Sequence, residues 1–190
     1  MFQHNDRGSR SRTSRRQYLL GIAATASTLV SGCLGEDDEE LPGTGPDGNT
    51  QSREIVVTYD EAVTARNDAV AARDEGISAF NEEAYTDAID AIETALSNFV
   101  SAEDCFAEAV DLATEIDANE AVDLCETAVD ETALQADATD AALSAARAAH
   151  DGADADIING HIERFRSLRE DAAAIDIADA DAVASALGLA

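Results

Sequence analysis

A heptad pattern between Tyr85 and Ile116 is the feature that most restricts the fold of this chain. Large side chains recur at every seventh residue, and a second series, mostly alanine, follows each of them by three residues. The first series is Tyr85, Ile92, Phe99, Phe106 and Ala113, and the second is Ala88, Ala95, Ala102, Ala109 and Ile116. A repeat sustained over this length predicts a long helix packed lengthwise on a partner, and the alanine series predicts a close approach of the two helices.

Helical spacing of apolar residues also extends to both sides of this segment, and no alternating pattern typical of strands is present. We expect helices over residues 53–80, 83–116, 118–150, 154–174 and 179–187. Their core-facing positions are predicted to be Val56, Val63, Val70 and Ile77, then Val122, Val129, Ala136 and Leu143, then Ile158, Ile162, Phe165, Leu168, Ala172 and Ile175. Breaks of a few residues favour antiparallel neighbours, so the sequence predicts an all-α, up-and-down bundle of three to four long helices.

Residues 66–100 carry a second pattern: Gly76, then Tyr85, Ala88-Ile89, Ile92 and Ala95-Leu96. This order resembles one tetratricopeptide repeat, which implies a tight helical hairpin. The chain departs from the repeat at Glu75, where an apolar residue is usual, and at Val100, where proline usually ends the second helix. No second copy follows, and about three repeats are needed to bury a continuous core, so we expect one hairpin and no peptide-binding groove.

The first 33 residues have the layout of an export signal. Five of the twelve arginines precede residue 17, and the uncharged run from Leu19 to Val30 covers twelve residues, which as a helix is about 18 Å long. That length is too short to span a bilayer core of roughly 30 Å, and together with the basic start it is typical of a cleaved signal peptide.

Two motifs within this segment resemble known export signals. Ser14-Arg15-Arg16-Gln17-Tyr18-Leu19 resembles the twin-arginine signal, and Val30-Ser31-Gly32-Cys33 resembles a lipobox. The resemblance implies cleavage before Cys33, a lipid on Cys33 and export of the folded protein to the extracellular side of the cell membrane. Because one acyl chain anchors a protein only marginally, a two-chain lipid or a second membrane contact is expected. The alternative is an uncleaved amphipathic or core helix.

Four segments follow from these boundaries. Residues 1–32 are the predicted signal peptide, residues 33–52 a lipidated cysteine and a flexible acidic linker that holds both prolines, residues 53–175 the bundle, and residues 176–190 a short helix and tail. The linker includes five consecutive acids, Glu36 to Glu40, and little in it could be buried.

Charge indicates the environment in which the protein works. Without residues 1–32 the chain keeps 7 arginines and 39 acidic side chains, has no lysine, and carries a formal charge of −32 over 158 residues. Self-repulsion of this size opposes compaction unless concentrated salt screens it. The composition resembles that of extreme halophiles' proteins, and the absence of a basic stripe argues against nucleic acid as a partner.

Cys105 and Cys125 are the cysteines that remain in the predicted mature chain. They lie at equal distances from residue 115, close to an expected turn, so their helices would bring them face to face and we expect a disulfide. Two buried free thiols are the alternative. Neither residue is expected to be a nucleophile, because no histidine is placed to activate it and the surroundings are acidic.

Two groups of polar residues near the C-terminus are candidate sites. The stretch with His150, Asp151, Asp154, Asp156 and His161 fails the calcium-loop template, so we expect no metal site. Arg164, Arg166 and Arg169 hold three of the seven remaining arginines. We expect them to pair with Glu163, Glu170 and acids of adjacent helices, and the alternative is an anionic ligand or partner.

No catalytic constellation or cofactor motif is present, so we expect no enzyme and no cofactor. The leading hypothesis is a membrane-anchored lipoprotein whose bundle acts through an unidentified protein partner or as an envelope component. The alternative is a small-molecule or ion-binding lipoprotein, accessory to a transporter. That alternative needs a concave pocket, for which the small side chains of a tight bundle are expected to leave little room.

Overall fold

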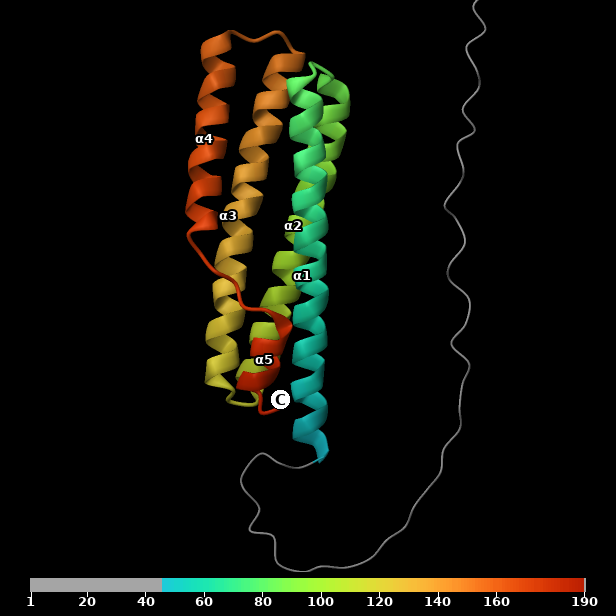
Figure 1. Ribbon diagram of the computed structural model, residues 1–190, viewed down its shortest axis with the longest axis vertical. Coiled ribbons are helices and arrows are strands. Elements are labelled where there is room, and N and C mark those ends of the chain that lie inside the picture. The colour runs from blue at the N-terminus through green and yellow to red at the C-terminus, as the bar shows by residue number, and fades with distance from the viewer. Residues whose placement is uncertain (1–45, 190) are drawn as a thin grey trace, which may run out of the picture. The chain divides into compact units, whose positions relative to one another are not determined.

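A computed structural model describes residues 46–189, which form five helices and, within this range, no strand (Figure 1). They are α1 (Pro46–Asn81), α2 (Tyr85–Glu115), α3 (Asn119–His150), α4 (Ala155–Ala173) and α5 (Ala180–Ala186). Helices α1, α2, α3 and α4 run alternately up and down, each packed on the one before it in the chain. The predicted all-α, up-and-down bundle is therefore confirmed.

The fourth position of the bundle is divided between two short helices. The backbone of α4 lies close to that of α3 and away from that of α1, and only side chains such as Phe165 reach across toward Arg73 of α1. By contrast, α5 packs against both α1 and α3 at the opposite end of the bundle. Figure 1 shows α4 beside the upper half of α3 and α5 between the lower halves of α1 and α3. At the lower end, α5 therefore covers the surface where α1 and α3 meet. At the upper end, α4 covers α3 and leaves part of α1 uncovered.

Left-handed residues end the long helices at the turns. Glu83 (φ 63°) and Asp117 (φ 56°) occupy this conformation after α1 and α2, and Gly152 (φ 71°) occupies it after α3. At each turn the amide of the next residue reaches back five residues to a carbonyl, as in Ala153 N to Ala148 O at 2.9 Å. This is the Schellman motif, in which a left-handed residue ends the helix.

The heptad of α2 is the part of the core that the sequence predicts best. All of its positions from Ala88 to Ala113 are buried, while the end positions Tyr85 and Ile116 are half-buried. Close approach on the alanine side is clearest at Gly76 of α1, where an added Cβ would lie 2.5 Å from Ile92 Cγ1 and 3.1 Å from the Ala88 carbonyl oxygen. The hairpin expected over residues 66–100 is present, within helices much longer than that segment.

The predicted core positions of α1 are wrong by one residue. Val56, Val63, Val70 and Ile77 are half-buried at the flank, and the buried positions are Ser52, Ile55, Tyr59, Ala62, Ala69, Arg73 and Gly76. The small residues allow α1 to approach α2 closely, which directs the larger valines to the edge of the contact.

α3 is buried more broadly than the predicted single face. Of the four predicted positions Leu143 is buried, whereas Val122, Val129 and Ala136 are half-buried. The reason is that α3 contacts α1, α2, α4 and α5, so most of its circumference faces protein. In α4, by contrast, only Phe165 and Ala172 are buried, because α3 is the one helix whose backbone lies close to it in the described part of the chain.

Both ends of the described range belong to the bundle. α1 begins at Pro46, so residues 46–52 are helical and the predicted linker over 33–52 extends too far toward the C-terminus. A proline at the first helical position lacks only an N–H that would have no helical partner, and Ser52 is buried against the fold. At the other end, α5 starts as expected at Asp179, whose Oδ1 accepts from the Ala182 amide at 2.8 Å.

Candidate functional site

A charged layer crosses the bundle between α1 and α3. Arg66 donates from Nε to Glu131 Oε2 at 3.0 Å and from Nη2 to Glu131 Oε1 at 2.5 Å. The Glu131 side chain is 2% exposed, and that of Arg66 is 20% exposed. The paired geometry is the fork-to-fork arrangement that makes arginine–carboxylate contacts strong, and it neutralises the buried carboxylate.

Gln135, one helical turn after Glu131 on α3, connects this layer to Arg73 of α1. Its Nε2 donates to Glu131 Oε1 at 2.7 Å, and its Oε1 accepts from Nη1 of Arg73. Arg73 is 3% exposed, and its Nε has no hydrogen-bond partner in the described part of the chain. Burial lowers the pKa of Arg73; Asp74 opposes this shift, and the nearby cations Arg169 and Arg66 add to it. The layer therefore holds two guanidinium groups and one carboxylate.

Two aromatic rings help to stabilise the buried charge of Arg73. Its guanidinium lies 5.4 Å from the centre of the Phe99 ring and 6.0 Å from that of Phe165, and Arg169 also lies 6.0 Å from the Phe165 ring. Such contacts favour a cation at an apolar site through the ring quadrupole. Phe165 of α4 thus links the buried layer to the surface.

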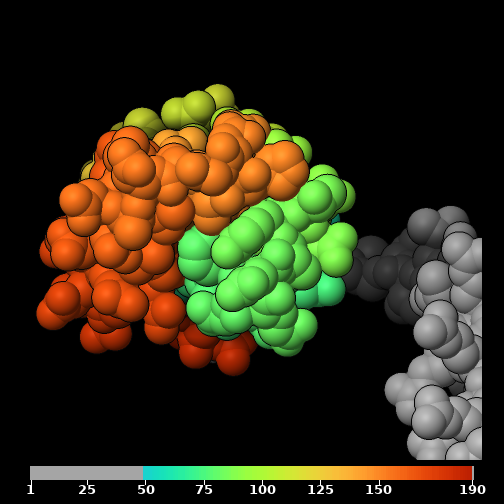
Figure 2. Space-filling model, turned by 90° about the horizontal axis from the view of Figure 1, so that it is seen from above, coloured from blue at the N-terminus to red at the C-terminus, as the bar shows by residue number. Residues whose placement is uncertain are grey.

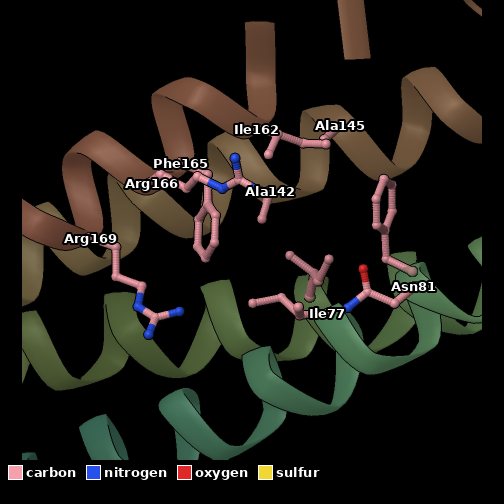
Figure 3. A pocket seen from close by; sticks show the side chains of 10 residues that line it. Ile77, Asn81, Ala142, Ala145, Ile162, Phe165, Arg166 and Arg169 are labelled. Carbon is pink, nitrogen blue, oxygen red and sulfur yellow. The ribbon is translucent and has the colours of Figure 1, made fainter. Parts of the chain in front are cut away.

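A groove of about 270 Å³ opens where the backbones of α4 and α1 stand apart (Figure 3). Its lining comes from four helices and comprises Ile77, Phe80, Asn81, Ile92, Ala142, Ala145, Ile162, Phe165, Arg166 and Arg169. No described lining residue is acidic, although the chain has 40 acidic residues. Figure 2 looks onto the end of the bundle where the α1–α2 turn (green) and the α3–α4 turn (orange) lie next to each other. The groove is apolar in its walls and positive at one edge.

The arginines of α4 do not pair as the sequence analysis expects. Within the described residues, Arg164, Arg166 and Arg169 form no ion pair, and neither Glu163 nor Glu170 serves as a partner. Arg166 and Arg169 instead border the groove, and both also line a second, more open hollow together with Phe165 and Glu170. The helix repeat explains this position, because residues 162, 165, 166 and 169 share one face.

Cys105 and Cys125 are both free thiols, so the expected disulfide is not formed. Cys125 is fully buried in the core, whereas Cys105 is half-buried at the flank of α2, where Glu61 of α1 is among its charged neighbours. Equal distance from the turn is therefore insufficient, because the two side chains lie on different faces. Burial raises the pKa of Cys125 to about 11, and burial followed by Glu108, Glu61 and Asp104 raises the pKa of Cys105.

The histidines do not assemble a site. His150 Nδ1 lies 3.3 Å from Asp151 Oδ1 at an exposed helix end. Among residues 46–189, no group of three or more histidine, cysteine, aspartate or glutamate side chains is arranged to hold a metal ion. The candidate residues His150, Asp151, Asp154, Asp156 and His161 are included in that statement.

The predicted address residues lie outside the described range. These are Arg15 and Arg16 of the export motif, Val30, Ser31 and Gly32 of the lipobox, and Cys33. Within residues 46–189, none of the helices is both long and apolar enough to traverse a membrane.

The sequence analysis did not predict the charged layer between α1 and α3 or the groove between α1 and α4. Arg73 belongs to the charged layer: a charged side chain is not expected in a core, yet it is buried together with its head group. Glu131 and Gln135, four residues apart on α3, were the available signal, because polar residues at that spacing among buried alanines require a partner.

No protein-family model matches this chain, and the searches of curated proteins and of solved structures also gave no match.

Proposed function

We propose that this chain is a non-enzymatic lipoprotein, held at the extracellular side of the cell membrane by a lipid on Cys33, whose bundle works as a ligand-binding module. The single observation that carries the binding role is the groove between α1 and α4. Two arginines without ion pairs border an apolar hollow there, in a protein that otherwise has a large excess of acids. Concave apolar sites with a few polar groups are the usual form of ligand sites.

The groove changes the order of the two hypotheses that the sequence left open. Small-molecule binding ranked second because a tight bundle was expected to lack a pocket, and the open side of α4 removes that objection. A role through protein contacts has less support. In the described range, the exposed large hydrophobic residues are Val57, Val100 and Ile157, on three different helices, and single exposed residues do not form a docking patch.

A non-enzymatic role is supported by the environment of the thiols. Both cysteines have raised pKa values, so the thiol form that they keep at neutral pH is a poor nucleophile. The buried carboxylate Glu131 is already engaged by Arg66 and Gln135, which leaves it unsuited to proton transfer.

Membrane fractionation in molar salt tests the anchoring. Cys33→Ser is expected to release the protein into the medium, and Arg15→Lys with Arg16→Lys is expected to block export while keeping the positive charge. Retention of Cys33→Ser on membranes would contradict the lipid anchor, and normal secretion of the lysine variant would contradict the twin-arginine route.

Native mass spectrometry of protein released from membranes tests the binding role. A reproducible small-molecule adduct is expected. Co-purification of a stoichiometric protein partner with no small-molecule adduct would return the protein-contact hypothesis to first place.

A further inference from the structure

We propose that the groove between α1 and α4 binds a small organic anion that combines one carboxylate with an apolar body, with Arg166 and Arg169 as its charge partners. This inference rests on the proposed binding role and specifies the class of ligand. It draws on three separate observations: the balance of charge at the groove, the chemistry of its walls and its size.

The charge around the groove is positive. Arg66 is engaged by Glu131, whereas Arg73 is bonded through Nη1 to the neutral Gln135 and keeps an unpartnered Nε while 3% exposed. Arg166 and Arg169 add two cations without ion pairs in the described part of the chain. Asp74 is the acid that acts most strongly on Arg73, and Glu170 lies near Arg166 and Arg169, but no residue that lines the groove itself is acidic. An anionic ligand would therefore meet positive charge at this edge without a carboxylate of the lining to repel it.

Guanidinium groups favour a particular kind of anion. Their planar forks match the two oxygens of a carboxylate or phosphate, and the resulting charge-assisted bonds are about twice as strong as neutral ones. Arg166 and Arg169 are three residues apart on α4, so both can reach one head group at the edge of the groove.

The apolar walls of the groove favour an organic carboxylate over inorganic phosphate. Five of the lining side chains are large and apolar, namely Ile77, Phe80, Ile92, Ile162 and Phe165. Figure 3 shows Phe165 extending from α4 into the space that faces Ile77 of α1. A ligand that is polar on all sides, such as inorganic phosphate, would lose hydration against these walls without compensation. An apolar body attached to the carboxylate gains from the same burial.

The volume sets the size of the ligand. About 270 Å³ lies just below the range of roughly 300–1,000 Å³ that is usual for drug-sized ligands. A medium-chain or aromatic monocarboxylate therefore fits, whereas a complete two-chain lipid does not.

Isothermal titration of the purified full-length protein in high salt tests this inference, with octanoate as the probe. Octanol keeps the apolar body without the charge, while acetate and inorganic phosphate keep the charge without the body. We expect octanoate to bind at least about tenfold more tightly than each of the three. Equal binding of octanoate and octanol would overturn the role of the arginines, and equal binding of octanoate and acetate would overturn the role of the walls.

A double variant, Arg166→Gln with Arg169→Gln, tests the named residues. It is expected to weaken octanoate binding by about tenfold or more, because both charge partners are lost. Arg164→Gln is the matched control, since this exposed arginine lies on the same helix and lines no part of the groove. Both positions of the double variant are exposed, so its circular dichroism should equal that of the parent. Unchanged affinity in a folded double variant would contradict the assignment.

The outcomes separate this inference from the function on which it rests. Octanol binding in the groove without preference for the carboxylate would leave a ligand-binding module and refute only the ligand class. No binding of any probe, together with no adduct on the protein released from membranes, would refute both.

Discussion

Arg66 of α1 and Glu131 of α3 are 65 residues apart in the chain and form a two-point ion pair inside the bundle. The Glu131 carboxylate also accepts a hydrogen bond from Gln135, whose amide oxygen in turn accepts one from Arg73. This one carboxylate is therefore the counter-charge for a layer that joins α1 to α3, and Arg73 of this layer lies 6.0 Å from the ring of Phe165, which lines the groove.

Glu131→Gln is expected to destabilise the protein by about 3 kcal/mol, because removing one partner leaves a poorly solvated guanidinium without compensation. Urea unfolding followed by circular dichroism, at constant high salt, measures this loss. Glu93→Gln provides the control, since Glu93 pairs with Arg147 at 2.7 Å while both side chains are about half exposed. An exposed pair is worth at most about 1 kcal/mol. Equal losses in the two variants would show that the buried layer contributes nothing special.

Gly76→Ala is expected to destabilise the protein by about 1–3 kcal/mol. The new Cβ would lie 2.5 Å from Ile92 Cγ1 and 3.1 Å from a backbone oxygen, so α1 and α2 must separate. Gly160→Ala makes the same chemical change in α4, where nothing lies within 4 Å of the added atom. That variant should gain about 0.5–1 kcal/mol from reduced chain entropy. Thermal unfolding of both proteins compares them, and a stabilised Gly76→Ala variant would contradict the close approach of the helices.

How far the sequence predicts this structure depends on the kind of contact. The heptad of α2 identifies its own core because each large residue and each alanine repeats at the period of the helix. The seam of α1 was misplaced because branched aliphatic residues such as Val56 and Val63 were preferred over alanines. The choice between the two depends on how closely the partner helix approaches, and a single helix does not carry that information.

The groove was beyond sequence reasoning for a different reason. It exists because the backbone of α4 lies close to α3 but away from α1, and because the chain after Ala173 crosses to place α5 at the other end. Both are properties of the whole arrangement. The sequence shows arginines at 164, 166 and 169, but the abundant acids nearby favour ion pairing as the prediction. Only the positions of these arginines relative to α1 distinguish ion pairing from binding of an anionic ligand.

Cys105 and Cys125 are expected to be labelled by iodoacetamide in the denatured protein without prior reduction, because both are free thiols. In the folded protein the half-buried Cys105 should react, and the fully buried Cys125 should be protected. Peptide mapping by mass spectrometry distinguishes the two sites. A sample reduced before denaturation serves as the control, and labelling that requires this reduction would establish the disulfide instead.

Tyr59 is expected to make the bundle sensitive to alkali. The residue is fully buried, and its hydroxyl donates to the Ala178 carbonyl oxygen at 2.8 Å. Burial, with smaller contributions from Cys125 and Asp179, raises the pKa of Tyr59 from 10.0 to about 12. Between these values the unfolded chain loses the phenolic proton while the folded chain keeps it. Stability is therefore complete below pH 10 and falls by roughly 2 kcal/mol as the pH rises to 12.

Tyr59→Phe isolates this effect. At neutral pH the variant should be about 1 kcal/mol less stable than the parent, because the Ala178 carbonyl loses its donor. Between pH 10 and pH 12 the difference should shrink and then reverse, since the variant has no phenol to titrate. The raised pKa of Cys125 weakens both proteins in alkali, and its cause, burial, is common to both. Urea midpoints measured across this range give the difference, with Tyr85→Phe as the control for losing a half-buried tyrosine hydroxyl. Parallel pH curves for the parent and Tyr59→Phe would contradict the contribution assigned to Tyr59.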